Sequence, residues 1–232
     1  KKNKPLADLL AYAAQFASTV KRKAVLELAE EVSRVADFEV EHPFEDYAFF
    51  PMGIPGYPGT DTGLLERKRD LFVASPFLSD DVAAQLTGFR GRKTLITRKA
   101  SVTPKVFGAF DHVYITKDVL SDNEFGAKQD IHAKLYFAAM EDGNYLYIGS
   151  ANASHNGFYR NGECLLRLKY KPYQMGFHLF CEEFLPKDGC PFQELTGIPE
   201  QPEKDSERKQ AAQALQEAVY ALKGAAVRRS GE

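Results

Sequence analysis

The residues from His132 to Glu163 carry the side chains of this sequence that are best suited to chemistry. His132 and Lys134 stand two apart in an alternating apolar pattern. A Gly-Ser-Ala-Asn segment follows and contains Ser150 and Asn152, and Glu163 comes shortly after it. An imidazole beside a cation, with hydroxyl, amide and carboxylate groups nearby, suits the chemistry of an anionic phosphoester. The imidazole would act there as a nucleophile or as a proton carrier.

A β-hairpin is the element that must bring these side chains together. The alternation from Ile131 onward predicts a strand that carries His132 and Lys134 on one face. Asp142-Gly143 predicts a two-residue turn, which would fold the strand back and place Lys134 opposite Ala151. Regular pairing then puts Ala151, and not its polar neighbours, on the face of Lys134. We therefore expect a bulge, or a chain that turns early at the preceding glycine.

The segment after this hairpin, ASHNGFYR, predicts a short helix. The amides at its start could bind a phosphate. The plainer interpretation of Ser150 and Asn152 is a turn at the end of a strand, which their composition also favours. We prefer the functional interpretation for Asn152 and hold it less firmly for Ser150. His155 is interpreted as an exposed histidine at the start of the helix and not as a ligand.

In this order and spacing the residues resemble the HKD signature of the phospholipase D superfamily, and most closely that of its bacterial nucleases. The resemblance implies that His132 attacks phosphorus and forms a phosphohistidine. Lys134 and Asn152 would stabilise the phosphoryl oxygens, with Ser150 beside them, and Glu163 would fix the tautomer of an imidazole. No metal and no cofactor is implied. One position departs from the signature, because Ala139 stands where the family has an acidic residue.

The superfamily builds one active site from two such motifs, whereas this chain shows one. The second histidine, which would protonate the leaving oxygen, must therefore come from an identical chain or from polypeptide upstream of Lys1. The sequence starts without Met, and its first region resembles the connector between tandem halves, which favours the upstream half. We favour the homodimer slightly, because twofold homodimers are the commonest oligomers. A larger complex is a further expectation.

Composition limits the classes of protein. The chain has 232 residues, 44% hydrophobic and 27% charged, with a formal net charge of −2, as in ordinary globular proteins. No apolar run is long enough to span a membrane, so we expect no membrane partner. The cysteines lack the spacing of metal ligands and are expected to be reduced, in the cytoplasm. They are Cys164, Cys181 and Cys190.

Short strands alternating with short helices predict an α/β fold, which the resemblance refines to a phospholipase-D-like mixed sheet flanked by helices. Residues 1–62 are expected to form a helical connector region, with two helices in 5–36, a strand over 38–50 and a Pro/Gly loop. Residues 63–185 form the expected catalytic domain. Its strands are predicted over 70–78, 93–98, 112–116 and 164–168, and its helices over 80–87 and 174–185. Residues 186–232 are expected to form a Pro-rich linker and a helix over 204–223.

A basic stretch lies upstream of the motif and contains no acidic residue. Its candidate nucleic-acid-binding side chains are Arg90, Arg92, Lys93, Arg98 and Lys99. Such a run is often only a solvated face, but on a slightly acidic protein it could bind a phosphate backbone. The sequence therefore predicts a metal-independent nuclease, with DNA favoured over RNA as its substrate. The alternatives are a lipid phosphodiesterase or transferase, and a catalytically silent subunit that binds nucleic acid or assembles a complex.

Overall fold

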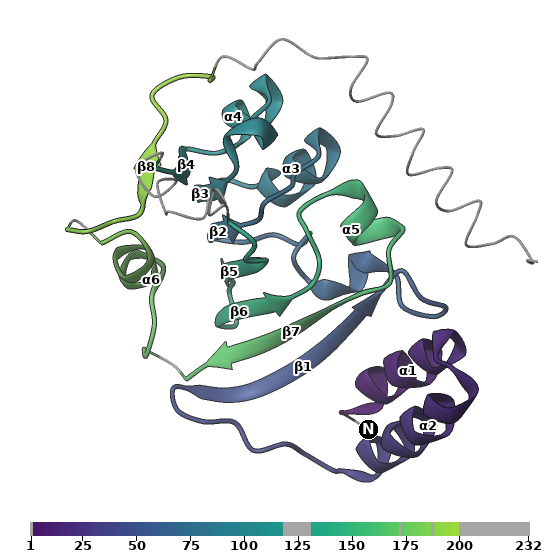
Figure 1. The fold of residues 1–232 in the computed structure, drawn as a ribbon. Coiled ribbons are helices and arrows are strands. Elements are labelled where there is room, and N and C mark those ends of the chain that lie inside the picture. The colour runs from purple at the N-terminus through teal and green to yellow at the C-terminus, as the bar shows by residue number, and fades with distance from the viewer. Residues whose placement is uncertain (1, 118–130, 172, 187, 200–232) are drawn as a thin grey trace, which may run out of the picture. The chain divides into compact units, whose positions relative to one another are not determined.

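The computed structural model describes residues 2–117, 131–171, 173–186 and 188–199 (Figure 1). The chain divides into two compact units, Lys1–Pro199 and Glu200–Glu232. The helix predicted over 204–223 belongs to the second unit and lies outside the described residues, so it stays a prediction. The predicted boundaries after residues 62 and 185 likewise stay predictions.

One mixed β-sheet forms the centre of the first unit, as expected for an α/β fold. Its strands lie in the order β1-β7-β6-β5-β2-β3-β4-β8. β2, β3 and β4 run parallel to one another, and the other neighbouring pairs are antiparallel. The strands are β1 (Phe44–Met52), β2 (Asp70–Ala74), β3 (Arg92–Thr97), β4 (His112–Thr116), β5 (Leu135–Ala139), β6 (Asn144–Gly149), β7 (Glu163–Tyr170) and β8 (Phe192–Glu194).

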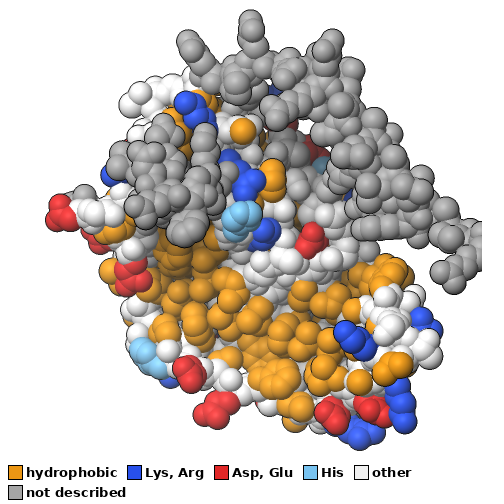
Figure 2. Space-filling model, viewed as in Figure 1, with side chains coloured by type: hydrophobic (Ala, Val, Ile, Leu, Met, Phe, Trp, Pro, Cys, Tyr) orange, Lys and Arg blue, Asp and Glu red, His pale blue; other side chains and the backbone are white. Residues whose placement is uncertain are grey.

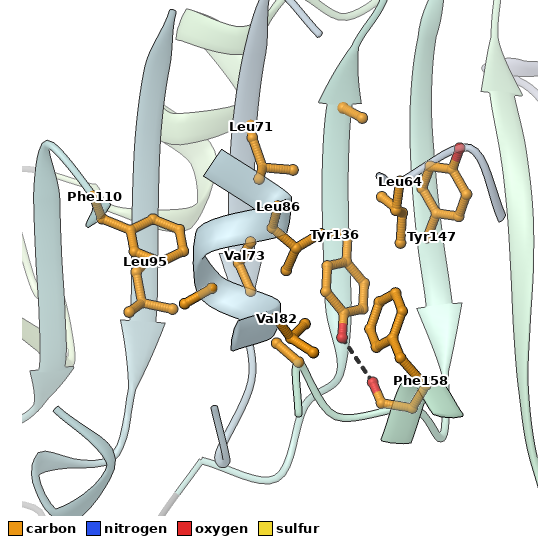
Figure 3. Packing of buried hydrophobic residues seen from close by; sticks show 14 of the residues in the cluster. Leu64, Leu71, Val73, Val82, Leu86, Leu95, Phe110, Tyr136, Tyr147 and Phe158 are labelled. Atoms are coloured by element: carbon orange, nitrogen blue, oxygen red, sulfur yellow. Dashed lines mark hydrogen bonds between the residues drawn. The ribbon is translucent and has the colours of Figure 1, made fainter. Parts of the chain in front are cut away.

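Helices cover both faces of this sheet (Figure 1). The α-helices beside the sheet are α3 (Asp80–Thr87), α4 (Pro104–Ala109), α5 (His155–Tyr159) and α6 (Phe177–Phe184). Side chains alternate along the inner strands, so Val73 points into the core under α3, α4 and α5, whereas Phe72 points into the core under α6. Figure 3 shows the first core, in which Val82 and Leu86 of α3 pack over the strands around Tyr136.

The second face continues beyond α6 toward β1 and carries rows of apolar side chains. α6 contacts β2 and β5. Farther along, strand pairing aligns Ile148 of β6 with Leu166 of β7, and Leu166 with Phe49 of β1. Figure 2 shows a broad hydrophobic area over these strands. Ile148 is 37% exposed within it. We call this area, over β6, β7 and β1, the open sheet face.

Two helices at the start of the chain confirm the helical N-terminal region that was predicted. They are α1 (Lys4–Ala13) and α2 (Thr19–Arg34), with a 3-10 turn between them at Ala14–Phe16. Asn3 is buried and joins them to the sheet, since its amide donates to the carbonyl of Val35 and accepts from the hydroxyl of Tyr47 at 2.6 Å. The two helices are thereby fixed to β1, which the sequence assigned to a connector and which forms one edge of the sheet.

Several element boundaries differ from the predicted ones for local reasons. β2 ends at Ala74 and not at residue 78, because Pro76 has no amide hydrogen to donate to a ladder. β8 lies inside the predicted Pro-rich linker, where Phe192–Glu194 pairs with the edge strand β4. Two further 3-10 turns, Gly59–Thr62 and Lys99–Ser101, lie in loops.

Candidate active site

All five predicted catalytic residues lie at one end of the sheet. The antiparallel pairing of β5 with β2 and β6 brings the start of β5 beside the ends of β2 and β6. His132 and Lys134 therefore precede β5 at the end where Ser150 and Asn152 follow β6. Glu163 is the first residue of β7, which is antiparallel to β6, so it reaches the same end. We call this the HKD end of the sheet.

The hairpin has a different register from the predicted one. β5 begins after Lys134, so His132 and Lys134 lie in the segment before the strand and not within it. The loop spans residues 140–143 and has four residues instead of two, as the pairing of the flanking strands shows. Lys134 consequently lies beside Gly149, whose amide donates to its carbonyl, and not opposite Ala151. A shift of two residues leaves the face of every side chain unchanged. Regular pairing would therefore still put Ala151, and not Ser150 or Asn152, on the face of Lys134.

The chain leaves this regular pairing at Gly149, where β6 ends, which is the early turn that the sequence analysis allowed for. A Cβ at this position would lie 2.0 Å from the carbonyl oxygen of Cys164, so only glycine permits the approach of the two strands. Ser150 follows, and its backbone amide donates to the same carbonyl at 3.0 Å. The Ser150 hydroxyl accepts from the amide of Cys164 at 3.1 Å. Ser150 thus joins the end of β6 to β7, and its hydroxyl hydrogen remains to be donated.

Asn152 is held through the backbone on both of its sides. The buried hydroxyl of Tyr136 donates to the carbonyl of Ala151 at 2.9 Å (Figure 3), and the amide of Ala153 donates to the hydroxyl of Ser75 at 3.0 Å. The Asn152 Oδ1 is buried and has no hydrogen-bond partner within the described part of the chain. An unpartnered buried polar atom costs about 1–3 kcal/mol, a cost that a hydrogen bond from a ligand or a water to Oδ1 would offset.

His132 is exposed, with a cationic side chain at its ring and another at its backbone carbonyl. Its Nε2 lies 3.4 Å from Nη2 of Arg98. A guanidinium has only donors, so a hydrogen bond between these two atoms requires Nε2 to accept and the ring proton to sit on Nδ1. The Lys134 ammonium donates to the His132 carbonyl at 2.9 Å. Nε2 therefore lies beside the Arg98 guanidinium, a cation that would attract an anionic substrate to this side of the ring.

Glu163 is placed more loosely than its predicted role requires. Its carboxylate accepts from the Asn161 amide at 3.3 Å, and no hydrogen bond joins it to His132 among the described residues. Burial raises the pKa of the nearby Tyr136 hydroxyl far above its usual range, and the charge of Glu163 raises it further. Glu163 thus lies near the group that fixes Ala151, and its action on an imidazole stays a prediction.

The expectation that the helix after this turn offers free amides is wrong for its first residues. α5 has five residues. The amide of His155 donates to the Ser79 hydroxyl, and that of Gly157 donates to the Ser154 hydroxyl. The His155 ring lies 2.7 Å from the Asp81 carboxylate. Hydrogen bonds from Ser79 first and His155 second lower the pKa of Asp81 to about 2. His155 thus joins α5 to α3, in agreement with its interpretation as a histidine at the start of a helix.

The predicted basic patch is divided by β3. Arg92 begins the strand and forms a two-pronged ion pair with Asp70, at 2.8 and 3.0 Å. Lys93 lies 3.7 Å from the carboxylate of Asp111. Arg98 follows the strand at the HKD end, and the strand between them is about 20 Å long at ~3.3 Å per residue. The five residues therefore form two groups: Arg90, Arg92 and Lys93 lie at one end, and Arg98 and Lys99 follow the strand at the other, where Arg98 lies beside His132.

Several residues that build the site escaped the sequence analysis. Tyr136 and Ser75 fix the Gly-Ser-Ala-Asn segment, and Phe77 carries the Arg98 guanidinium 4.6 Å from its ring centroid. The sequence offered one signal for them. Ser75 and Phe77 flank Pro76 directly after a buried strand, where functional loops are common.

No cluster of three or more histidine, cysteine or acidic side chains suited to a metal is present in the described ranges. Within the same ranges, no helix combines the length and the apolar character needed to cross a bilayer.

The sequence and the structure were compared with those of known proteins. No family model and no curated protein matches the sequence. The chain is similar to NucT from Helicobacter pylori, with 20% identity and a TM-score of 0.40 over 53% of this chain and 84% of that one. It is also similar to phosphatidylserine synthase of Haemophilus influenzae, with 12% identity and a TM-score of 0.48 over 87% of this chain and 53% of that one. A third structure is Nuc from Salmonella typhimurium, with 12% identity and a TM-score of 0.38 over 55% of this chain and 86% of that one.

Nuc is described as a phospholipase D family member, so a member of the superfamily that the motif resembles is among the matching structures. The chain spans about half the length of the phosphatidylserine synthase that it matches. At these identities the likeness concerns the fold, and the chemistry of the site has to be argued from its own residues. The TM-scores of these three likenesses lie below 0.5, so the resemblance to the phospholipase D superfamily rests on the HKD-like motif.

Proposed function

We propose that this chain is a phosphodiesterase that cleaves nucleic acid, with His132 as its nucleophile. The observation that carries this proposal is the exposed His132, whose Nε2 lies 3.4 Å from the Arg98 guanidinium while the Lys134 ammonium donates to its carbonyl. An unprotonated imidazole nitrogen next to fixed cations is suited to attack a phosphodiester, because the cations attract the substrate and stabilise the charge that develops on its oxygens.

The reaction would proceed in two steps. In the first, Nε2 of His132 forms a bond to phosphorus while the bond from phosphorus to the leaving oxygen breaks, and that oxygen takes a proton from a general acid. In the second, water attacks phosphorus, the phosphorus–nitrogen bond breaks, and the proton of the water returns to the same group. Lys134 and Asn152 would stabilise the phosphoryl oxygens in both steps. The backbone that carries Asn152 is held by the hydrogen bonds of its two neighbours.

Nucleic acid is the substrate class that we favour over a lipid, because Arg98 and Lys99 add positive charge at the HKD end. Such charge binds a polyanion along its backbone through the release of counterions. The cytoplasmic location and the preference for DNA over RNA remain predictions. A lipid phosphodiesterase and a silent binding subunit are the alternatives that the experiment must separate.

The test is to incubate the purified chain with single-stranded DNA, RNA and phosphatidylcholine vesicles, each in excess EDTA. We expect cleavage of nucleic acid, no release of the lipid headgroup, and an acid-labile phosphoryl group on His132 in quenched reactions. Cleavage of the vesicles alone would favour the lipid enzyme. Binding of nucleic acid without any cleavage would favour the silent subunit, and activity that returns only with Mg²⁺ or Mn²⁺ would refute the mechanism.

We further propose that a second copy of this chain completes the site. The first step needs a general acid, and His155, the other histidine close to the Gly-Ser-Ala-Asn segment, is paired with Asp81. The open sheet face offers a surface for the second copy. It is apolar from β6 to β1, and it begins at Leu135, which pairs with Ile148 and lies three residues after His132. A twofold pair of such faces would bring two HKD ends together.

Subunit mixing tests this second proposal. Wild-type chains mixed with increasing amounts of His132→Ala chains should lose activity faster than by dilution, since each mixed dimer lacks one histidine. Light scattering of the same samples should report a dimer, and Ile148→Glu on the open sheet face should convert it to an inactive monomer. A fully active monomer would contradict the shared site. If a monomer became active only when an upstream polypeptide was added, the second motif would come from that polypeptide and not from a second copy.

A further inference from the structure

We propose that Phe77 and Arg98 form a subsite for single-stranded nucleic acid, in which Arg98 binds the phosphate that is cleaved and Phe77 stacks on the flanking base. This subsite rests on the proposed function of His132 and specifies its substrate. The predicted motif contains neither residue, and both reach the HKD end from loops that follow the parallel strands β2 and β3.

The position of Arg98 argues for contact with the reacting phosphate. Its Nη2 is 3.4 Å from Nε2 of His132. A phosphorus atom poised for attack lies about 3–3.5 Å from its nucleophile. Its non-bridging oxygens would then fall within hydrogen-bonding distance of the guanidinium. Arg98 is suited to this contact because a planar guanidinium can bind two phosphate oxygens at once.

Phe77 is an exposed aromatic residue directly beside this contact. The residue is 50% exposed although its side chain is large and apolar. The Arg98 guanidinium lies 4.6 Å from the ring centroid. The backbone of Phe77 is held by the Ser75 hydroxyl, which donates to its carbonyl at 2.9 Å. The backbone of Phe77 is therefore held in place, and its ring contacts the same guanidinium that contacts His132. Half of the residue's surface remains exposed to a ligand.

The chemistry of a nucleotide fits the two side chains together. Every base has a flat face that stacks on an aromatic ring, and the phosphate next to it meets the guanidinium. A base paired inside a duplex cannot present that face, which selects single strands. The acyl chain of a lipid would gain only apolar contact from one exposed ring, so a nucleobase is the ligand that we favour.

The experiment compares a thymidine oligomer with an abasic oligomer of equal length, which has the same phosphates and no bases. With wild type, kcat/KM for the thymidine oligomer should exceed that for the abasic one by about five- to a hundredfold, the range expected for one stacked base. Phe77→Leu should bring this ratio close to one. Phe16→Leu, at an exposed phenylalanine of the N-terminal region, is the matched control and should keep the wild-type ratio.

Arg98 is tested with the same two substrates. Arg98→Met should lower kcat/KM for both oligomers by about 10²-fold or more, as for the loss of one phosphate-stabilising donor. Arg98→Lys should recover part of that loss. Arg67→Met, at an exposed arginine that precedes β2, is the matched control and should leave both rates within about twofold of wild type, since an exposed surface charge contributes little. Equal losses in the two arginine variants would overturn the assignment of Arg98.

Binding of both oligomers, measured by fluorescence anisotropy, separates failure of the subsite from failure of the proposed function. A chain that cleaves both oligomers equally well, with no effect of Phe77→Leu, retains its function and refutes the subsite. A chain that cleaves neither oligomer but binds the thymidine oligomer more tightly, with that preference lost in Phe77→Leu, refutes the function and retains the subsite. Cleavage of phosphatidylcholine vesicles that depends on Phe77, without any preference between oligomers, would assign the ring to a lipid.

Discussion

The two ends of the central sheet use charged side chains in opposite ways. At the end where β2 and β3 begin, Arg92 is tied to Asp70 and Lys93 lies beside Asp111. At the HKD end, the Arg98 guanidinium lies on the Phe77 ring and faces an imidazole. The first arrangement joins neighbouring elements of the fold. The second presents cations to the place where a phosphate would react.

This contrast shows that a run of like charges in a sequence need not form one surface. A strand of six residues separates its two ends by about 20 Å, so the basic residues before and after β3 serve different neighbours. Arg92 and Lys93, at the start of β3, lie beside carboxylates of neighbouring elements. The basic residues after the strand share a sheet end with the HKD-like motif. The predictions that follow test whether the two ends differ in function as they do in structure.

The largest effect is expected from His132→Asn at the HKD end. Loss of a covalent nucleophile should lower phosphodiester cleavage by more than about 10⁴-fold, beyond the effect of losing a general acid or base alone. Because His132 is exposed, its replacement should leave the thermal unfolding curve unchanged. Turnover is measured on a labelled oligonucleotide and unfolding by circular dichroism. Retention of wild-type turnover would remove His132 from the mechanism.

A smaller loss is expected from Lys134→Met. Its ammonium is proposed to stabilise the phosphoryl oxygens, and removal of one such group costs about 10²–10³-fold in kcat. The loss should appear in kcat more than in KM, because the charge on the oxygens is greatest in the transition state. A change confined to KM would instead make Lys134 a residue that only binds substrate.

At the opposite end, Asp70→Asn should change stability and not activity. Burial raises the pKa of Asp70, but hydrogen bonds from Arg92 outweigh this effect and hold the pKa below its ordinary value of 3.8. The ion pair thus stabilises the fold above that value, and its contribution is lost as the pH falls through the lowered pKa. Asp70→Asn should cost about 1 kcal/mol at neutral pH, since Arg92 is partly exposed, and little at pH values below the lowered pKa.

Urea unfolding at neutral and acidic pH measures this difference, with cleavage followed in parallel. An equal loss of stability at both pH values would mean that packing, and not charge, holds the two strands together there. A loss of cleavage at unchanged stability would contradict the division between the two ends.

The smallest effect compares two exposed cations of the divided patch. Lys99→Gln should reduce the slope of log affinity against log salt by about one for single-stranded DNA, because one phosphate contact is lost. Arg90→Gln, before β3, should leave the slope unchanged. Equal slopes in the two variants would restore the single basic patch that the sequence suggested, and the titration is made with the same labelled oligonucleotide for both.

The sequence by itself located most of the elements and indicated the chemistry that is proposed for the site. Apolar alternation and turn residues located the helices of the N-terminal region, the strands β2, β3, β4 and β7, and the hairpin, because these patterns are local. The spacing of His132, Lys134, Ser150, Asn152 and Glu163 indicated phosphodiester chemistry, and the structure brings all five to one sheet end. The exact hairpin register was not determined, since two- and four-residue turns leave the same face buried.

Only the tertiary structure decided which distant residues join this motif. The parallel pairing of β2 with β3 brings Phe77 and Arg98 together, and the antiparallel pairing of β5 with β2 brings His132 to them. No local pattern encodes either pairing, because strand order depends on how the apolar faces of the whole sheet are covered. The pairing of β2 with β3 also brings Arg92 beside Asp70. It thereby separates two halves of a basic run that is continuous in the sequence.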